Sequence, residues 1–548
     1  MAERVESYKA FNQSPPYEDI DLFASDLPLR DAVAANGAAT DTDALGAFGR
    51  RWGTGEMFAL GRQANEHPPR LVAFDAKGFR RDTIEFHPAY HLFMAESMAA
   101  RLHASTWRSD ATAAPAPAQV ARTARFYMAA QVETGHLCPI TMTRAAVAAL
   151  AAEPALAAAM MPRIAGREYD SRFEPWWTKK SATFGMGMTE RQGGSDVRAN
   201  TTSALPAGEG YAISGHKWFM SAPMCDAFMV LAQAPGGLTC FLMPRFRPDG
   251  SVNGLRLQRL KDKLGNRSNA SAEVEFVDAS AWRVGEEGRG VRTIIQMVQL
   301  TRLDCAIASA GLMRIALAHS IHHARYRTAF GKRLVEQPIM QRVLADMALD
   351  VEAATALVMR LARSFDLAAA DPQEAARVRL LTSAAKFWMC KRAPALVCEA
   401  MECLGGNGYV EENLLPRLYR EAPVNAIWEG SGNIMALDVQ RVFAREREPA
   451  RAVLDVLAAE AGDLPAQCGW VETIENALNS LDAECDTRAA VERLALLAAT
   501  AALRASAPPR IADLFLRARL PDRHGEFFGT STISSSDADL ILRRALAD

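Results

Sequence analysis

The segment from residue 340 to residue 365 repeats apolar residues at intervals of three and four. The pattern runs through Met340, Val343, Leu344, Met347, Val351, Ala354, Val358, Leu361 and Phe365. This period places every one of them on one face of a long α-helix. Similar patterns predict helices over about 292–325, over 373–402 and after residue 429. Long helices with apolar stripes bury them against one another, so residues 291–444 are predicted to form a four-helix bundle.

Composition divides the rest of the chain into three further regions. Residues 1–182 are rich in alanine and other helix formers and predict an N-terminal helical domain. Residues 183–290 contain more glycine and short strand-like runs, which predict a middle β domain. Residues 445–548 begin with a polar run, expected to be a solvated connection, and continue as an extra helical domain interrupted at Pro508-Pro509. The chain is therefore mainly α with a central β domain.

Global properties exclude several classes of protein. The formal net charge of −2 gives no general attraction to nucleic acid or to anionic membranes. The nine cysteines form no CxxC pair, which predicts reduced core thiols. The polar N-terminus does not resemble a signal peptide, and the apolar run at 494–503 is too short to span a bilayer. We therefore expect a cytoplasmic protein that does not insert into a membrane.

Four short motifs each allow a functional and a purely structural interpretation. "MGMTERQGGSDV" at 186–197 is a ligand-binding loop or a tight turn, and "GHKWFMSAP" at 215–223, with aromatics beside a small hydroxyl residue, is a ligand-facing strand or a core strand. "ARYRTAFGKRL" at 324–334 suits a pyrophosphate or a solvated helix end. "CLGGNGYVEEN" at 403–413 is a second glycine turn or a helix C-cap.

The stretch "AIWEGSGNIMALDVQRV" at 426–442 places Glu429 between a tryptophan and three small residues. A surface glutamate needs neither a tryptophan before it nor three small residues after it, so this setting points to a functional carboxylate. The alternative is a helix N-terminus, in which Ser431 or Asn433 caps the following helix and Glu429 only favours the helix dipole. Taken alone, this stretch favours the second interpretation.

Together, in this order and spacing, the motifs resemble those of the acyl-CoA dehydrogenase family of flavoproteins. The resemblance is strongest over residues 180–442, and the opening "FNQSPPYEDIDLFASDLPLRDAV" with the C-terminal extension resembles the AidB-like, alkylation-response branch. It implies a helical domain, a β-barrel-like middle domain and a four-helix bundle, with FAD as cofactor. The implied FAD contacts are Met186, Met188, Thr189, Gly194, Ser195, Phe219, Met220, Ser221, Arg327, Gln337, Gly405, Gly406, Gly430, Ser431 and Asn433.

The resemblance also implies a reaction. Glu429 matches the glutamate that removes the α-proton of an acyl-CoA thioester while the β-hydride passes to the flavin. Ser195, Arg302 and Trp428 are the implied substrate contacts. Arg327 matches an arginine that reaches the FAD of a neighbouring subunit, so a homo-oligomer is expected, with four subunits. Phenylalanine at 219 and glutamate at 402 depart from the family's usual tryptophan and glutamine.

Two other groups of residues were weighed as binding sites. His87 and His91, four apart, would suit a metal on a helix, but no third ligand is evident and Pro88 predicts a helix start, so no metal is expected. From Arg441 to the end, 13 arginines face 17 acidic residues. Arg510, Arg517 and Arg519 nevertheless predict a basic stripe for double-stranded DNA, or a solvated face paired with acidic residues.

Three functions follow from these readings. The first is an FAD-dependent acyl-CoA dehydrogenase that desaturates a short or branched, isovaleryl-CoA-like thioester. The second is a flavin-containing DNA-binding protein that protects DNA from alkylation. The third is a silent flavoprotein scaffold, against which Glu429 argues. The electron acceptor is unknown from the sequence.

Overall fold

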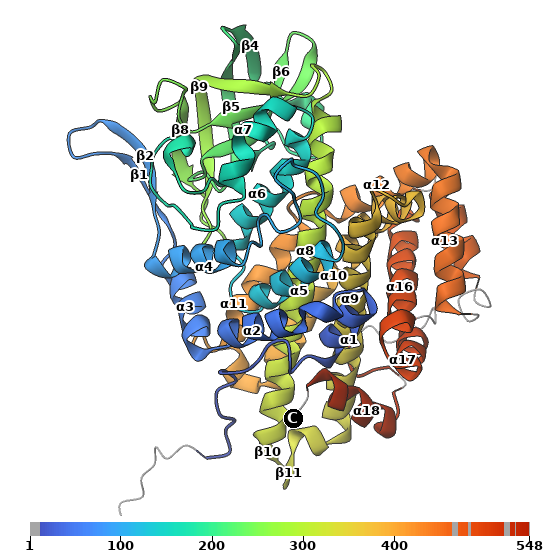
Figure 1. Ribbon diagram of the computed structural model, residues 1–548. Helices are drawn as coiled ribbons and strands as arrows, with labels where there is room; N and C mark the ends of the chain where they lie inside the picture. Colours follow the sequence, from blue (N-terminus) through green and yellow to red (C-terminus); the bar gives the residue numbers. More distant parts are fainter. Residues whose placement is uncertain (1–10, 463–468, 480–483, 520–526, 532, 547–548) are drawn as a thin grey trace, which may run out of the picture.

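In a computed structural model, the chain folds in the order helices, β domain, helical bundle and further helices (Figure 1). The structure describes residues 11–462, 469–479, 484–519, 527–531 and 533–546. The β domain lies at the top of Figure 1 and the long bundle helices run beneath it. The expectation of a mainly α protein with a central β domain is confirmed.

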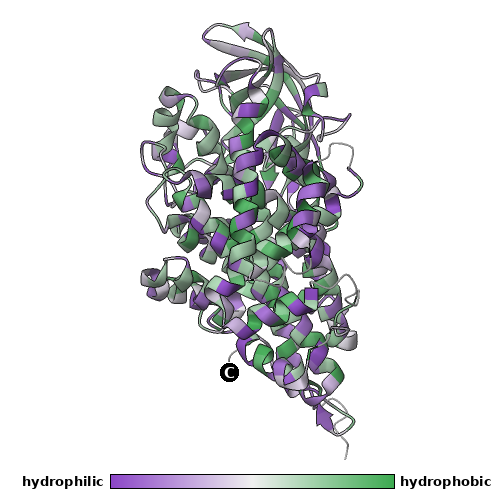
Figure 2. Cartoon of the chain, turned by 90° about the vertical axis from the view of Figure 1, so that its right-hand side faces the viewer, coloured by the Kyte–Doolittle hydropathy of each residue, from purple (hydrophilic) through white to green (hydrophobic). Residues whose placement is uncertain are grey.

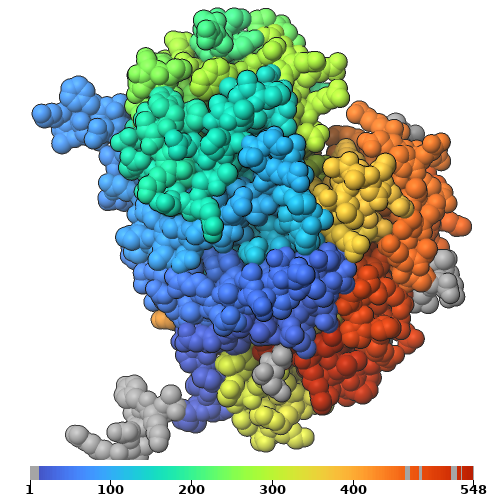
Figure 3. Space-filling model, viewed as in Figure 1, coloured from blue at the N-terminus to red at the C-terminus, as the bar shows by residue number. Residues whose placement is uncertain are grey.

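The N-terminal region is helical, as predicted, apart from a two-stranded antiparallel hairpin. Its helices are α1 (Leu27–Ala35), α2 (Thr42–Trp52), α3 (Gly55–Glu66), α4 (Pro88–Ala99), α5 (Ala118–Ala130), α6 (Leu137–Leu150) and α7 (Pro154–Ile164). The hairpin, β1 (Arg70–Phe74) and β2 (Arg80–Glu85), was not predicted and projects from the body (Figure 3). Its turn uses Gly78 at φ +85°, a backbone conformation that glycine adopts without strain.

The middle domain is one seven-stranded sheet with the order β3-β5-β4-β6-β7-β9-β8. Additional pairings of β3 with β6 and of β5 with β9 curl the sheet back on itself, so the predicted barrel-like form is confirmed. The strands are β3 (Phe184–Gly187), β4 (Ser203–Ala207), β5 (Gly210–Ser221), β6 (Ala227–Ala234), β7 (Gly237–Pro244), β8 (Leu255–Leu260) and β9 (Ser271–Val284).

The predicted four-helix bundle is present, and its helices are α8 (Gly290–Tyr326), α9 (Pro338–Leu367), α10 (Pro372–Cys403) and α12 (Gly432–Arg445). A short hairpin, β10 (Thr328–Ala329) and β11 (Lys332–Arg333), joins α8 to α9, and α11 (Leu414–Glu421) lies between α10 and α12. Hydrophobic residues gather along these helices in the middle of the molecule (Figure 2). Within the described residues, α8 is one helix with the length and composition of a membrane span, but 89% of its most apolar stretch is buried in the fold.

The C-terminal region packs into the same hydrophobic core as the bundle. Its helices are α13 (Arg447–Ala461), α15 (Trp470–Asn479), α16 (Thr487–Ser506), α17 (Pro509–Arg519) and α18 (Ser535–Ala545). The polar run AREREPARA after Arg441, expected to be a solvated connection, is largely exposed but helical, because Glu446 alone separates α12 from α13. Pro508-Pro509 does end one helix and start the next, as predicted. Buried side chains from α13 to α18 join the bundle's cluster, so this region lies flush against the body (Figure 3).

Candidate functional site

Glu429 lies in a tight turn between the 3-10 segment Ala422–Ala426 and α12. Its backbone is left-handed, at φ +58°, and Gly430 follows at φ +104°. A non-glycine residue in this region costs free energy and persists only where the surroundings hold it. The turn therefore depends on contacts from neighbouring helices.

Three side chains supply those contacts. Thr301 Oγ1, on α8, donates a hydrogen bond to Glu429 Oε2 at 2.7 Å. Arg302 Nε donates to the Glu429 carbonyl oxygen at 3.1 Å, and Lys386 Nζ, on α10, donates to the Gly430 carbonyl oxygen at 2.8 Å. Two successive carbonyls are thus held by two cations, and the carboxylate is aimed by a hydroxyl.

Arg302 positions the Glu429 turn in this structure, and its contact with the substrate stays a prediction. Its guanidinium is buried and pairs with Asp438 of α12 at 2.9 Å. It also donates to Ser383 Oγ at 3.2 Å, and Arg379 contacts the same Asp438 carboxylate at 3.1 Å. With its donors turned to α10, α12 and the Glu429 backbone, Arg302 fixes the turn.

The electrostatics of the turn suit a base. Burial raises the pKa of the Glu429 carboxyl above its ordinary value, and the Thr301 hydrogen bond and the charges of Lys386 and Arg302 oppose that rise. Removal from water destabilises a carboxylate and strengthens its affinity for a proton. A carboxylate with a raised pKa accepts a proton more readily than an exposed glutamate does.

A narrow pocket of about 30 Å³ lies beside Glu429. That space holds about two water molecules. Most of its surface is apolar, because carbon and sulfur atoms of α5, α6 and α8 face it. The lining residues are Phe126, Thr134, Leu137, Cys138, Thr141, Met142, Thr301, Asp304, Cys305, Ala308, Glu421, Asn425, Trp428 and Glu429.

The structure brings the predicted flavin segments together next to this turn. In the β domain Met186 stands opposite Ser221, so the loop after β3 and the end of β5 share one edge. Met186 and Met188 belong to the same apolar cluster as Trp428. The middle domain and the bundle therefore meet at the residues that the motifs single out.

A buried ion pair supports the glycine loop that follows β3. Glu190 and Lys217 form a buried ion pair at 2.8 Å. Burial alone would raise the pKa of Glu190, but the Lys217 charge and several hydrogen bonds lower it to about 2. A Cβ at Gly194 would lie 2.3 Å from Thr189 Oγ1, so only glycine fits there. Ser195 is exposed beyond this point, where a ligand can reach it.

Not every side chain of the segment 219–221 can contact a ligand. Phe219 is 48% exposed, and its ring lies 4.6 Å from Lys261 Nζ. Met220 is fully buried in the β-domain core, because successive side chains of a strand point to opposite faces. The Met220 side chain therefore faces the core, and the predicted flavin contact of this residue, which stays a prediction, would use its backbone.

The predicted contacts to a neighbouring subunit's cofactor lie at the far end of the bundle. Arg327 is partly exposed and donates to the Asn12 carbonyl oxygen at 2.8 Å. The Gln337 side chain donates to the hairpin after α8 at 3.0 Å. A Cβ on Gly405 or on Gly406 would meet no atom within 4 Å, so their backbone faces open space. A flat or anionic group can approach this edge closely.

The start of α12 differs from the predicted cap. Ser431 occupies the N-cap position but makes no capping hydrogen bond with its side chain. Asn433 Oδ1 instead accepts from Arg488 Nη1 at 2.6 Å. The expected side-chain cap is therefore absent, and the turn is held by the cations described above.

The predicted arginine stripe in α17 does not form a free basic surface. Arg510 makes an ion pair with Asp537 at 2.8 Å. Arg519 is largely buried and reaches Asp346 at 2.8 Å and Asp350 at 2.9 Å. Arg510 and Arg517 are both exposed, but Arg510 is already paired with a carboxylate. The pairing alternative is the one observed, because acidic residues of α9 and α18 face this helix.

Sequence reasoning missed three residues that shape the site. Thr301 and Lys386 contact the turn directly, and Asp438 holds Arg302 in place. Lys386 carried a usable signal, since a lysine within an apolar helical run must have a buried partner. Separately, His87 is the N-cap of α4, as Pro88 predicted, and the described residues hold no group of three metal-ligating side chains.

Comparison with known proteins agrees with this arrangement. Family models match residues 185–279 as an acyl-CoA dehydrogenase middle domain and 288–444 as an acyl-CoA dehydrogenase C-terminal domain. The chain belongs to the acyl-CoA dehydrogenase family. A third model, the N-terminal domain of the adaptive response protein AidB, matches residues 12–171. Family membership supports FAD as the cofactor, and the open glycines and exposed Phe219 leave room for it.

Individual relatives place the chain within the family. It is 47% identical over 525 residues to "Putative acyl-CoA dehydrogenase AidB" of Escherichia coli (strain K12), covering 95% of this chain and 96% of the relative, and is thus an AidB homologue. The structure of Caenorhabditis elegans ACDH-11 in complex with C11-CoA aligns with a TM-score of 0.81 at 27% identity, covering 98% and 92% of the two chains. The apo form of Bd2924 aligns with a TM-score of 0.83 at 27% identity, over 91% and 100%.

Proposed function

We propose that this protein is an FAD-dependent dehydrogenase of a short or branched acyl-CoA, with Glu429 as the base. The observation that carries the proposal is the Glu429 turn: a partly buried carboxylate with a raised pKa, aimed by Thr301 into a narrow apolar pocket. Arg302 and Lys386 donate hydrogen bonds to the backbone carbonyls of this turn. A merely structural glutamate has no need of two cations on its backbone.

The residues would act on the Cα–H bond of the thioester. The Glu429 carboxylate takes the α-proton, and the bonding pair becomes part of the new Cα=Cβ double bond. FAD, when bound, would supply the acceptor for the β-hydrogen and its two electrons, so that the oxidation balances. Trp428 excludes water from the carboxylate, and a dry site strengthens its pull on the proton. Thr301 keeps the reacting oxygen in one orientation.

The size of the pocket supports a short or branched acyl group. About 30 Å³ of free space beside Glu429 accommodates only a few carbon atoms unless side chains move. The apolar lining disfavours a charged acyl group, because burying an unpaired charge is costly. An isovaleryl-like group, compact and apolar, meets both conditions.

Anaerobic mixing of the flavin-loaded protein with acyl-CoAs of increasing length tests the proposal. Reduction bleaches the flavin absorbance, and we expect it with four- and five-carbon acyl groups. If none of the thioesters bleaches the flavin of a protein with full FAD content, the proposed reaction is wrong.

We further propose that the protein assembles as a homo-oligomer of four subunits that share cofactor sites. Phe330, at the tip of the hairpin after α8, is 99% exposed, and the backbone of Gly405 and Gly406 faces open space. Large exposed aromatics are typical of association surfaces.

Arg327→Ala is expected to lower FAD content and to shift the oligomer toward smaller species, because Arg327 would contribute both to FAD binding and to the contact between subunits. Flavin absorbance per chain and light scattering measure the two effects. A variant that keeps full flavin as a stable monomer would contradict shared sites.

Protection of DNA from alkylation is a second candidate function, and it rests on the homology to AidB alone. The ion pairs of Arg510 and Arg519 give it no support in α17. We therefore keep dehydrogenation as the principal proposal.

A further inference from the structure

Three neighbouring cavities, the Glu429 pocket, a smaller chamber and an open groove, follow one another from Glu429 toward the surface. The Glu429 pocket and a smaller chamber share two lining residues, Thr134 and Glu421. The chamber in turn shares Asn65, Arg417 and Glu421 with a large open groove. Residues that line two cavities at once form the wall between them.

The chamber differs from the Glu429 pocket in chemistry. It has about 10 Å³ of free space, close to the volume that one water molecule needs. Charged side chains surround it, namely Glu133, Arg417 and Glu421. Arg417 Nη1 is buried and has no protein partner, so a water in the chamber would satisfy it.

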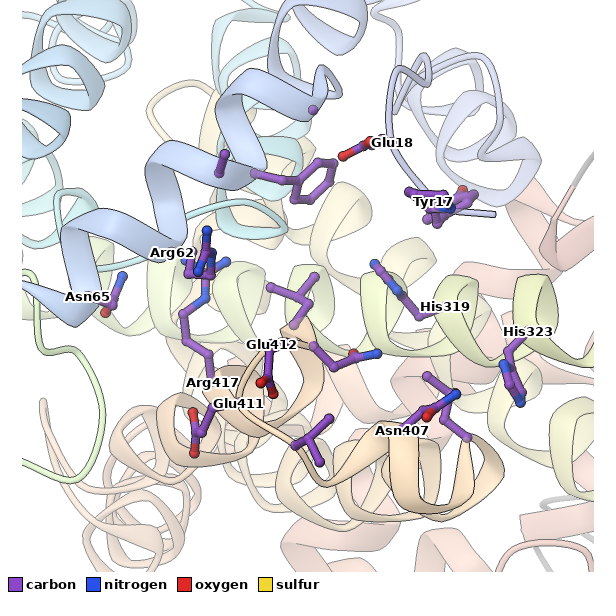
Figure 4. A pocket seen from close by; sticks show the side chains of 18 of the residues that line it. Tyr17, Glu18, Arg62, Asn65, His319, His323, Asn407, Glu411, Glu412 and Arg417 are labelled. Carbon is purple, nitrogen blue, oxygen red and sulfur yellow. The ribbon is translucent and has the colours of Figure 1, made fainter. Parts of the chain in front are cut away.

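The groove beyond is open to solvent. It has about 940 Å³ of free space and runs between α3, α8 and α11. Figure 4 shows Asn65 and Arg417 at one end of it, with His319, His323 and Asn407 toward the other. The chamber is therefore separated from the open groove only by the wall that contains Asn65 and Arg417.

We propose that Thr134 and Glu421 form the end wall of the acyl pocket and set the length of acyl chain that fits. This rests on the proposed dehydrogenase function. A longer chain would have to displace the wall and then place methylene groups against Glu133, Glu421 and Arg417. Stripping water from charged groups without replacing their hydrogen bonds is strongly unfavourable.

The wall is rigid because both residues are held by other contacts. Glu421 Oε1 accepts from Asn266 Nδ2 at 2.9 Å, and the Thr134 hydroxyl also bonds to this carboxylate. Gly135 N donates to Glu133 Oε1 at 2.8 Å, and a Cβ on Gly135 would lie 1.9 Å from Ser268 Oγ. The backbone around Thr134 consequently has no room to shift.

Thr134 offers a matched pair of substitutions. Thr134→Ala removes volume and the hydroxyl, and so joins the pocket to the chamber. Thr134→Val removes the hydroxyl but keeps the volume, and so leaves the wall in place. Thr134→Ser removes only the methyl group and gives an intermediate opening in a residue that retains its hydrogen bond.

The experiment measures kcat/KM for butyryl-CoA and octanoyl-CoA in the flavin-loaded wild type and the three variants. The ratio of octanoyl to butyryl activity should rise about tenfold or more in Thr134→Ala. It should rise less in Thr134→Ser and stay within about twofold of wild type in Thr134→Val. The proposed end wall is contradicted if the ratio of octanoyl to butyryl activity is unchanged in Thr134→Ala and Thr134→Ser. It is also contradicted if this ratio rises equally in Thr134→Ala and Thr134→Val.

Binding of the matching non-oxidisable 3-thiaacyl-CoAs, measured by calorimetry, separates the two proposals. Suppose that the wild type oxidises no acyl-CoA, but that Thr134→Ala gains affinity for the longer thioether and Thr134→Val does not. The proposed end wall is then supported and the dehydrogenase proposal is contradicted. If oxidation is observed and neither the activity ratio nor the affinity depends on the side-chain volume at residue 134, only the proposed end wall is contradicted.

Discussion

Glu429 shows how one carboxylate is placed by partners that are distant in sequence. Its side chain is held from α8 by Thr301, and the carbonyls of its turn are held from α8 by Arg302 and from α10 by Lys386. Asp438 of α12 completes the arrangement by pairing with Arg302. Because three helices converge on one turn, the orientation of the base is a property of the whole bundle.

The pH dependence of the reaction should follow the raised pKa of Glu429. Only the carboxylate accepts the α-proton, so activity is lost as the pH falls through that pKa. Thr301→Val removes a hydrogen bond that favours the charged form, worth about 1.5–3 kcal/mol, or about one to two pH units. The acidic limb of kcat should therefore move to higher pH in this variant.

Rates of anaerobic flavin reduction at saturating substrate, measured across a pH series, give this shift directly. Thr141→Val is a suitable control, because Thr141 lines the same pocket but bonds to Asp304 and not to Glu429. An acidic limb that stays in place in Thr301→Val would show that the hydroxyl does not tune the base.

At the level of single residues, the sequence singled out Glu429 and the glycine loop, but it gave no sign of the partners that hold Arg302. Glu429 was recognisable because its motif is local. The partner of Arg302, Asp438, lies 136 positions away, and no local pattern reveals such a pair. The burial of the Met220 side chain follows from strand alternation only once the register of the strand is known.

Among the elements, the turn before α12 carries the strongest conformational demand. Gly430 has φ +104°, and a Cβ there would lie 2.6 Å from Met435 Cε. Gly430→Ala combines left-handed strain with a steric clash and should lower the free energy of unfolding by about 2–4 kcal/mol. It should also slow flavin reduction, because the neighbouring Glu429 must shift.

Gly78→Ala is the matched control for this turn. Gly78 has a similar φ of +85°, but a Cβ there would meet no atom within 4 Å. Its cost should be about 1–2 kcal/mol of strain alone, without an effect on the reaction. Denaturant titrations of both variants provide the comparison, and equal losses of stability and activity would refute a special role for the 430 turn.

Long helices were the most predictable elements, because many turns of one periodic stripe add up to a strong signal. The predicted helix over 373–402 compares with Pro372–Cys403 in the structure. The hairpin at Arg70–Phe74 and Arg80–Glu85 was missed because its strands are short and lie within an alanine-rich helical region. Two strands of five and six residues leave too few positions for a period to emerge.

Over the whole molecule, the C-terminal helices are built into the core and do not form a separate appendage. Arg519 of α17 reaches Asp346 and Asp350 of α9, two carboxylates that are almost wholly buried. The change in composition after Arg445 did not reveal this packing. The polar run there is helical and exposed, whereas the helices that follow it turn their apolar side chains toward the core.

Arg519→Ala should lower the free energy of unfolding by about 3–5 kcal/mol, since it removes one charged partner from two buried carboxylates. Arg517→Ala, on the same helix but exposed, should change it by no more than about 0.5 kcal/mol. Thermal unfolding of the two variants tests whether α17 is part of the core. Equal and small effects would mean that the C-terminal helices are not anchored through Arg519.

The most direct measurement compares wild type with Glu429→Gln in anaerobic stopped-flow flavin reduction by the best acyl-CoA of the panel. The amide is nearly the same size as the carboxylate, so FAD content and fold should be preserved. It cannot accept the α-proton, so the rate of bleaching should fall by a factor of about 10² to 10⁴. Bleaching of the Gln variant at the wild-type rate, with full FAD content, would show that Glu429 is not the base.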